Sequence, residues 1–556
     1  MLRASITALL ISINALSNPN WEEDAYIPES GRSNPYEIIS SELPEQIRLG
    51  KTHALIYPVE PTGILIPFHP LRKLLNRFAW DPMKITFLRS YGIRENLSNP
   101  NEFWQWLGMH SYPEKNEKGI YSVPYPTHSK PAYPMGVTLR ETRDGVGVTF
   151  SCAACHSANL FGKRVLGMTN RFPRANRFFY RSKRMIQKVP PWAFRFVMGT
   201  TAGEKRLYAQ ARENSQFVDA REPMALGLDT SLSHTALSLA RRAPDDIATK
   251  DPYYARHPDD EPLAKFPSDS KPSVWWNLKY KNRWLSDGSV VSGNPIYTNL
   301  LWNEIGRGTD LVKLEEWLDT NPEVIRSLTT AVFASEPPRF SDFFPMSSHH
   351  VERAKRGEKL FLQSCAKCHG VYEKAWSSPS EEARSPEALS ETIRVSYHES
   401  TPVIDVGTDP LRFQAMESLA KRLNPLAISI RKNILIRPQE GYVPPPLVGI
   451  WARWPYFHNN SAPNLCAVLT QGEERPKKYF AGEAEDPETD FDRHCNGYPL
   501  GSKTPEKWKR NKEALFNSEI PGLSRLGHDE GIFLQQGKEI FLPEQKLDLI
   551  AFLQTL

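Results

Sequence analysis

Two pairs of cysteines carry the clearest chemistry in this chain, because a histidine directly follows each pair. The pattern Cys-x-x-Cys-His occurs twice, at Cys152, Cys155 and His156 and at Cys365, Cys368 and His369. Paired thiols at this spacing can add across the two vinyl groups of a haem, and the adjoining histidine then lies beneath the ring as an iron ligand. The sequence therefore predicts two covalently bound haem c groups.

Thiolate pairs have other uses, and two of them remain possible here. They can bind zinc or act as dithiol redox centres, and two pairs could meet around one metal. Neither alternative requires a histidine after the second cysteine in both copies. Haem attachment is the favoured interpretation, which makes the chain a di-haem c-type cytochrome.

The composition is that of a globular protein. The 556 residues suit two to four domains, and 40% hydrophobic with 11% aromatic residues can build packed cores. The 47 prolines predict long irregular connections between elements. A net charge of +5 and a pI of about 8.7 are mild for this length and do not imply a nucleic-acid partner.

Basic residues interleave with aromatic ones between residues 171 and 188. An exposed amphipathic helix would explain this pattern. The alternatives are arginines that pair with haem propionates, or a docking face for an acidic redox protein. The basic residues are Arg171, Arg174, Arg177, Arg181, Lys183, Arg184 and Lys188.

The first residues favour export. Residues 1–18 combine a positive start with an apolar run too short to span a bilayer, as in an export signal. No other segment approaches about 18 uninterrupted apolar residues, so no transmembrane span is expected. Haem attachment of this type occurs outside the bacterial cytoplasm, which also points to a periplasmic or secreted protein. In that oxidising setting Cys466 and Cys495 are expected to form a disulfide, with two buried free thiols as the alternative.

Local signals predict a mainly α protein with long loops. A serine-capped helix over 347–362 leads into the second motif, another begins at Asn321-Pro322, and a third begins at Pro543. Strand-like alternation is scarce. We place a boundary at Pro337-Pro338, which gives an N-terminal haem domain over 19–338 and a C-terminal haem domain over 339–556.

A comparison of the two halves predicts a difference between the irons. Aligning residues 287–289 with residues 459–461 sets Ser286 against His458. An imidazole can close the distal face of a haem, whereas serine ligates haem iron poorly. The second haem is therefore expected to be bis-histidine, with His369 and His458 as ligands, and the first to keep an open face. Alternatively His458 only caps a turn, and Met416 is then the next ligand candidate.

Several stretches resemble the bacterial di-haem cytochrome c peroxidase and MauG superfamily, and most of all its rubber oxygenase (RoxA-like) branch. They are the two Cys-x-x-Cys-His motifs, the tryptophan segment after Pro272, residues 447–461, and residues 134–139, 407–410 and 521–528. The resemblance covers most of residues 100–556.

The resemblance implies two cytochrome c-like haem domains packed together. It also implies a first haem that binds dioxygen or peroxide and a second that relays electrons. A tryptophan lies between the rings in this superfamily, and Trp276 is the best match, although Trp275 and Trp276 could both be core residues. The rubber-oxygenase relatives cleave double bonds of polyisoprene with dioxygen.

Three functions remain, and the sequence ranks them. Peroxidases of this superfamily place a carboxylate shortly after the Asp-Gly pair, but here the nearest downstream acid is Glu304. A haem-dependent oxygenase acting on a hydrophobic substrate therefore ranks first. A peroxidase served by a small redox protein ranks second, and a pure electron-transfer cytochrome third.

Overall fold

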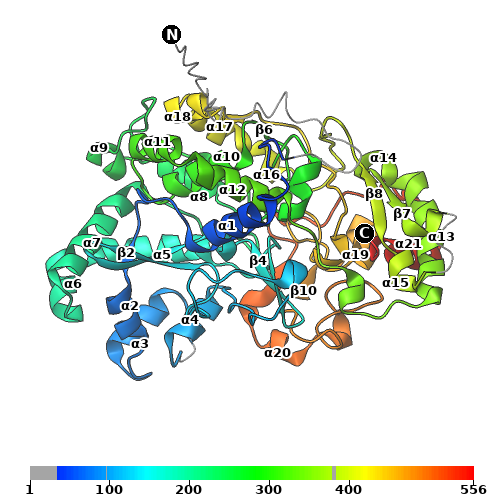
Figure 1. Cartoon of the computed structure of the whole chain (residues 1–556), viewed down its shortest axis with the longest axis horizontal. Helices are drawn as coiled ribbons and strands as arrows, with labels where there is room; N and C mark the ends of the chain where they lie inside the picture. Colours follow the sequence, from blue (N-terminus) through cyan, green and yellow to red (C-terminus); the bar gives the residue numbers. More distant parts are fainter. Residues whose placement is uncertain (1–33, 95–96, 379–383) are drawn as a thin grey trace, which may run out of the picture.

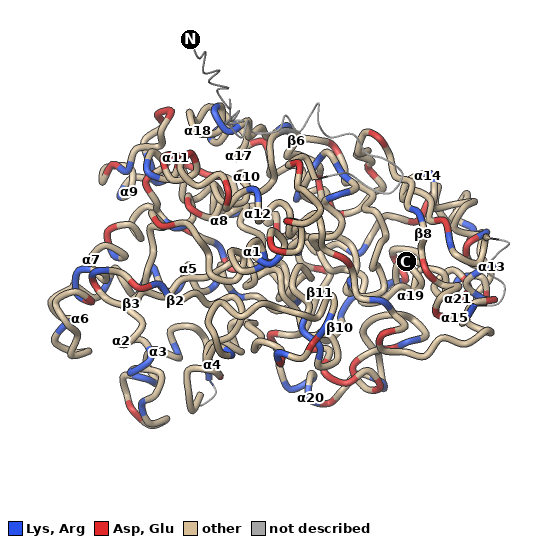
Figure 2. Tube along the Cα trace, viewed as in Figure 1, with Lys and Arg blue, Asp and Glu red and all other residues tan. Residues whose placement is uncertain are grey.

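The computed structural model of this chain describes residues 34–94, 97–378 and 384–556 (Figure 1). The expected export signal over residues 1–18 lies outside the described residues. Within them, no helix is both long and apolar enough to cross a membrane. Lys and Arg are interspersed with Asp and Glu along most of the trace (Figure 2).

A small antiparallel sheet leads the chain to the first motif. Its strand order is β1 (Ile66–Pro67), β3 (Gly145–Phe150), β2 (Val137–Thr142), with Leu139 opposite Val148. The chain leaves β3 directly into a 3-10 turn over Cys152–Ala154, and the hairpin β4 (Ser157–Leu160) and β5 (Lys163–Leu166) follows. Strands therefore bracket the first motif, so the fold is mixed α/β with long loops and not mainly α.

One end of the molecule is built from short helices around their own hydrophobic cluster. Figure 1 shows these helices in blue and cyan at its lower left. They are α2 (Phe68–Leu75), α3 (Pro82–Ser90), α4 (Pro100–Trp106), α5 (Ala175–Lys188) and α6 (Pro191–Met198), and α7 (Ala202–Asn214) packs on α6 through Tyr208 and Phe194.

A second cluster joins segments from both sides of Pro337-Pro338. Gly50 of α1 lies so close to α12 that an added Cβ would be 1.9 Å from the carbonyl oxygen of Ser327. Met416 is fully buried in this cluster, as expected of a core residue. The helices here are α1 (Leu43–Ile56), α8 (Leu232–Leu239), α10 (Pro295–Ile305), α11 (Leu311–Thr320), α12 (Pro322–Phe333), α17 (Met416–Leu423) and α18 (Ala427–Arg431).

The helix expected before the second motif is present as α13 (Ser348–Ser364), capped by the Ser347 side chain. It packs along α21 (Pro543–Leu553), and Gly357 permits the close approach because an added Cβ would be 2.0 Å from the Asp548 carbonyl oxygen. Helix α12 begins at Pro322, as expected, but the Asn321 side chain does not cap it. The Asn321 amide donates to the Trp317 carbonyl oxygen because α11 ends directly before it.

The remaining elements are short. Cys466 of α19 (Leu465–Val468) is joined to Cys495 in a disulfide with Cα atoms 5.0 Å apart. The other helices are α9 (Pro252–Arg256), α14 (Ala366–His369), α15 (Pro386–Leu389), α16 (Leu411–Gln414) and α20 (Glu506–Lys509). The paired strands are β6 (Val290–Ser292) with β9 (Leu435–Ile436), β7 (Val371–Lys374) with β8 (Thr392–Ser396), β10 (Lys478–Phe480) with β11 (Leu515–Asn517), and β12 (Leu534–Gln535) with β13 (Lys538–Glu539).

Candidate haem sites

Each cysteine-histidine motif lines its own cavity. Cys365, Cys368 and His369 line one of about 250 Å³, and the first motif lines another of about 240 Å³. The two cysteine pairs therefore do not surround one metal, as the zinc alternative would need. All four of these cysteines are free thiols. Both motifs thus present what covalent haem attachment requires, namely two thiols and an imidazole at the wall of a cavity.

The imidazole of His369 is held in a defined orientation. Its Nδ1 lies 2.8 Å from the carbonyl oxygen of Pro445. A ring whose Nδ1–H donates to a carbonyl keeps Nε2 as the free ligand nitrogen, which is how proteins fix a metal-binding histidine. Burial lowers the pKa of His369 to about 4, so the ring stays neutral and able to ligate.

His528 faces His369 across the second cavity. The ring centroids are 6.3 Å apart and the ring planes meet at 56°. Metal–imidazole bonds are about 2 Å long, and the ring nitrogen lies about 1 Å from the ring centre, so two imidazoles on opposite sides of one metal have centroids about 6 Å apart. Burial lowers the pKa of His528 to about 3. The pair therefore has the spacing of two axial ligands.

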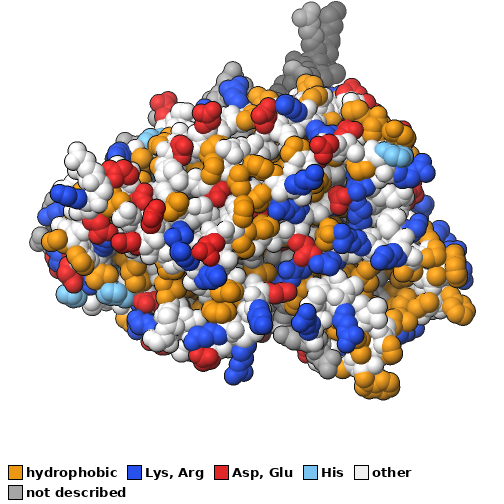
Figure 3. All heavy atoms as spheres, turned by 180° about the vertical axis from the view of Figure 1, so that it is seen from behind, with side chains coloured by type: hydrophobic (Ala, Val, Ile, Leu, Met, Phe, Trp, Pro, Cys, Tyr) orange, Lys and Arg blue, Asp and Glu red, His pale blue; other side chains and the backbone are white. Residues whose placement is uncertain are grey.

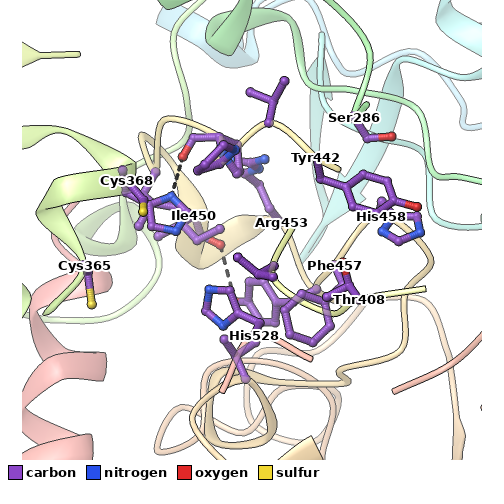
Figure 4. Close-up of a pocket in the computed structure, with 18 of the residues that line it drawn as sticks. Ser286, Cys365, Cys368, Thr408, Tyr442, Ile450, Arg453, Phe457, His458 and His528 are labelled. Atoms are coloured by element: carbon purple, nitrogen blue, oxygen red, sulfur yellow. Dashed lines mark hydrogen bonds between the residues drawn. The ribbon is translucent and has the colours of Figure 1, made fainter. Parts of the chain in front are cut away.

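His458 lies elsewhere in the same cavity. Its ring stacks on Tyr442 with centroids 4.0 Å apart and planes at 18°. Figure 4 shows His528 nearer the two cysteines and His458 at the other end of the cavity, beside Tyr442 and near Ser286. Ligation by His458 stays a prediction. The geometry next to His369 favours His528 as the second ligand. His528 belongs to residues 521–528, one of the stretches that resemble the superfamily, but the sequence did not predict it as a ligand.

Among the described residues that line the first cavity, no two imidazoles face one another as His369 and His528 do. The ring of His156 lies near Trp275, with centroids 5.9 Å apart. Burial lowers the pKa of His156 to about 4, so this ring is neutral too. Among the described residues, the other histidine of this cavity is His234, whose ring packs against Phe179 at 4.7 Å. The contrast with the second cavity is consistent with one closed and one open iron.

Apolar side chains form much of the remaining wall of the first cavity. Helix α10 contributes two of them, Leu285 precedes that helix, and α12 adds two more. Ser286, the expected open-face residue, lines both cavities, and its hydroxyl lies 3.4 Å from that of Ser270. The aliphatic residues of this wall include Leu285, Ile296, Leu300, Leu328 and Val332.

Glu304 is buried and fully engaged in a polar network. Its carboxylate accepts hydrogen bonds from Tyr57, Thr62 and Thr309 and pairs with Arg307 at 2.8 Å. Among the described residues, the carboxyl group that lines the first cavity is instead that of Asp229, whose backbone carbonyl oxygen lies 4.0 Å from the Cys155 sulfur. Burial raises the pKa of Asp229 to about 7. Sequence reasoning had no signal for Asp229.

Trp276, the tryptophan expected between the rings, is not among the described residues that line either cavity. Trp276 is fully buried, and its indole Nε1 donates to the Val448 carbonyl oxygen at 2.9 Å. Its neighbour Trp275 does line the first cavity. A role for Trp276 between the haems stays a prediction.

Buried cations separate the two cavities. Lys271 and Lys281 line both of them, and Arg453 lines the second. The Lys271 ammonium donates to the carbonyl oxygens of Arg453, at 3.3 Å, and Pro455. Burial holds the pKa of Lys271 well below its usual range, and the charged groups acting on it, Arg453 and Arg171, are themselves cations.

Basic groups in such a site keep their charge only where an anion lies nearby. Burial lowers the pKa of Lys281 to about 8 and that of Arg453 to about 10. The carboxylate acting on Lys281 is Asp287, which is already paired with Arg412 at 3.0 Å. Haem propionates are carboxylates carried into such a cavity by the cofactor, so the charges of this wall fit two haems.

The favoured interpretation of the basic run, an amphipathic helix, holds for its five later residues, which lie on α5, but not for Arg171 and Arg174. Arg171 is buried and donates to the carbonyl oxygens of Trp454 and Ala452, both at 2.9 Å. Arg174 is also buried and donates to the Trp106 carbonyl oxygen. Helix α5 begins just after these residues. Arg171 therefore fastens the chain before α5 to the second motif's half of the molecule.

Comparison with known proteins gives one family match. A family model described as RoxA-like, cytochrome c-like matches residues 441–480, which include the part of the second cavity from Tyr442 to His458. This match supports a cytochrome c-like domain in the chain, a class that carries covalently bound haem c and works in redox chemistry.

Two curated relatives come from Sinorhizobium fredii (strain NBRC 101917 / NGR234), and both are called uncharacterized proteins. The chain is 36% identical to y4iJ over 114 residues, which is 20% of this chain and 17% of that protein. It is 25% identical to y4iM over 285 residues, which is 50% of this chain and 60% of that protein. The chain thus matches less than two thirds of either relative.

Proposed function

We propose that this chain is an exported di-haem c-type cytochrome oxidoreductase with two unlike haem sites. The second haem is six-coordinate, between His369 and His528, and transfers electrons. The first is held by His156 and keeps an open face for dioxygen or peroxide. The observation that carries the proposal is the 6.3 Å spacing of His369 and His528, which has no counterpart around His156 among the described rings.

The bound haems would supply irons that exchange electrons and, at an open face, take up a small oxidant. The protein residues hold and tune that chemistry. Pro445 orients His369 through the Nδ1 contact at 2.8 Å. Lys271 and Lys281 stand between the cavities, where they can neutralise propionates of both haems.

We favour oxidation of an unsaturated hydrocarbon, such as cleavage of polyisoprene, as the reaction at the first site. The apolar wall formed by Leu285, Ile296 and Leu300 would exclude water and accept an apolar chain. The peroxidase alternative needs a mobile acid–base group beside the oxidant. Glu304 is poorly suited to that role because four partners hold its carboxylate. Asp229 lines the first cavity, but its carboxylate already accepts hydrogen bonds from the Asn176 backbone N–H, which fixes it in place.

An electron paramagnetic resonance spectrum of the oxidised holoprotein tests the assignment directly. One low-spin and one high-spin signal are expected, and carbon monoxide should bind at a single haem after reduction. Two low-spin signals with no ligand binding would leave a pure electron-transfer cytochrome. Oxygen uptake with emulsified polyisoprene would support the oxygenase, whereas peroxide consumption with a reduced donor, and no reaction with hydrocarbon, would support the peroxidase.

A further inference from the structure

Helix α6 exposes large apolar side chains at one end of the molecule. Trp192, Phe196 and Val197 are 69%, 87% and 47% exposed. The inner side of the helix is packed normally, since Phe194 stacks on Tyr208 with ring centroids 3.8 Å apart. The outward side chains are therefore a feature of a well-anchored helix and not of a loose one.

A second pair of exposed aromatic residues lies on the turn between α2 and α3. Phe78 and Trp80 are each 75% exposed and stack on one another at 5.9 Å. Lys73, at the end of α2, donates to the carbonyl oxygen of Met198 at 3.2 Å and so ties α2 to the end of α6. Figure 3 shows hydrophobic side chains gathered at its lower right, on the side where α6 and α3 lie.

The cations at this end are exposed, and the nearby acids are engaged. Lys73, Lys188 and Arg195 are exposed, and none of them forms an ion pair among the described residues. Asp81 accepts hydrogen bonds from the first backbone N–H groups of α3. The Glu204 carboxylate accepts a hydrogen bond from the Thr201 backbone N–H in the capping box that begins α7. The surface thus combines projecting aromatic rings with uncompensated positive charge.

We propose that this end of the molecule, formed by Phe78, Trp80, Trp192, Phe196 and Val197 with Lys73, Lys188 and Arg195, docks onto an anionic phospholipid bilayer. Tryptophan and phenylalanine enter the boundary between headgroups and acyl chains, and lysine and arginine bind the anionic headgroups. A partner made only of hydrocarbon would contact the aromatic rings but would offer no anion to the lysines and the arginine. The charge therefore favours lipid over a hydrophobic polymer as the occupant.

The test is co-sedimentation of the full-length holoprotein with vesicles. Binding is expected to vesicles of phosphatidylglycerol and phosphatidylethanolamine, and much less to phosphatidylcholine alone. Trp192→Ser/Phe196→Ser should weaken binding by about tenfold or more. Lys73→Gln/Lys188→Gln/Arg195→Gln should weaken it on the order of 100-fold at low salt, because each surface cation adds about 1 kcal/mol.

Matched controls distinguish binding through this surface from nonspecific binding through other exposed apolar residues. Ile430 and Leu542 are 69% and 68% exposed and lie outside it, so Ile430→Ser/Leu542→Ser should bind like wild type. The haem absorption spectrum of each variant checks that it folds. If Trp192→Ser/Phe196→Ser does not fold, Phe78→Ser/Trp80→Ser takes its place. Equal binding to both kinds of vesicle, no loss in the variants, or binding to polyisoprene droplets but not to anionic vesicles would overturn the proposal.

Discussion

The imidazoles of His369 and His528 face one another across the second cavity, with centroids 6.3 Å apart. His369 is the last residue of the short helix α14, whereas His528 lies on a loop near the C-terminus with a positive φ of 55°. Its backbone N–H donates to the Val406 carbonyl oxygen at 2.7 Å, which anchors the loop. Two distant segments therefore meet at one position.

This relationship predicts the effect of removing His528. His528→Ala should convert the low-spin iron to high-spin, because one axial imidazole is lost. Electron paramagnetic resonance of the oxidised protein measures the change. His458→Ala is the matched control and should leave the low-spin signal, since its ring stacks on Tyr442. The reverse pattern would restore His458 as the ligand.

The four motif thiols predict the haem count. Mass spectrometry of the exported protein should show two covalent haems, and Cys365→Ala/Cys368→Ala should lose one of them. Cys152→Ala/Cys155→Ala should lose the other. If the wild-type protein carried no haem, or carried zinc, the assignment of both motifs would be contradicted.

Lys271 lines both cavities, so its charge should act on both haems. Lys271→Met is expected to lower both reduction potentials, because a nearby positive charge favours the reduced iron. A spectroelectrochemical titration measures each potential, and Lys271→Arg keeps the charge as a control. Unchanged potentials in Lys271→Met would show that this lysine does not neutralise haem propionates.

The ion pair between Asp287 and Arg412 is buried and spans 3.0 Å. Arg412→Met should destabilise the holoprotein by about 3–5 kcal/mol, because it leaves the carboxylate buried without its partner. Urea denaturation measures the loss. Lys421→Ala, which removes an exposed pair with Glu417, should change the midpoint very little. Similar midpoints for both variants would count against a structural role for Arg412.

Buried neutral histidines predict acid sensitivity. Burial lowers the pKa of His110 to about 3 and that of His234 to about 4, whereas a histidine in the unfolded chain has a pKa of about 6.5. Below about pH 6.5 the unfolded state binds more protons, so stability falls as the pH drops from there toward 4. Each histidine should cost on the order of 2 kcal/mol at pH 5.

Thermal denaturation of the holoprotein between pH 7 and pH 4.5 checks this sensitivity. His110→Gln should flatten the decline, whereas a change at the exposed His128 should leave it as in wild type. An equally steep decline in His110→Gln would assign the acid sensitivity to other groups.

The contiguous features were predictable from the sequence. A Cys-x-x-Cys-His motif is held by the chain itself, so its thiols and imidazole stay together in any fold. Helix α13 was predictable for the same reason, since Ser347 and the apolar residues of that helix act locally. The strands flanking the first motif have only four to six residues, so the alternation at Val146, Val148 and Phe150 of β3 was too brief to predict a sheet.

Tertiary packing decided which imidazole lies opposite His369 of the second motif. The sequence comparison treated Ser286 and His458 as equivalent positions in two separate halves. In the structure these segments pack against each other, since Val443 N–H donates to the Ser286 carbonyl oxygen and Lys271 N–H to that of His458, at 2.8 and 2.9 Å. They form one shared wall, which leaves the place beside His369 to His528. A ligand so far along the chain leaves no local pattern, because only long-range burial brings it to its site.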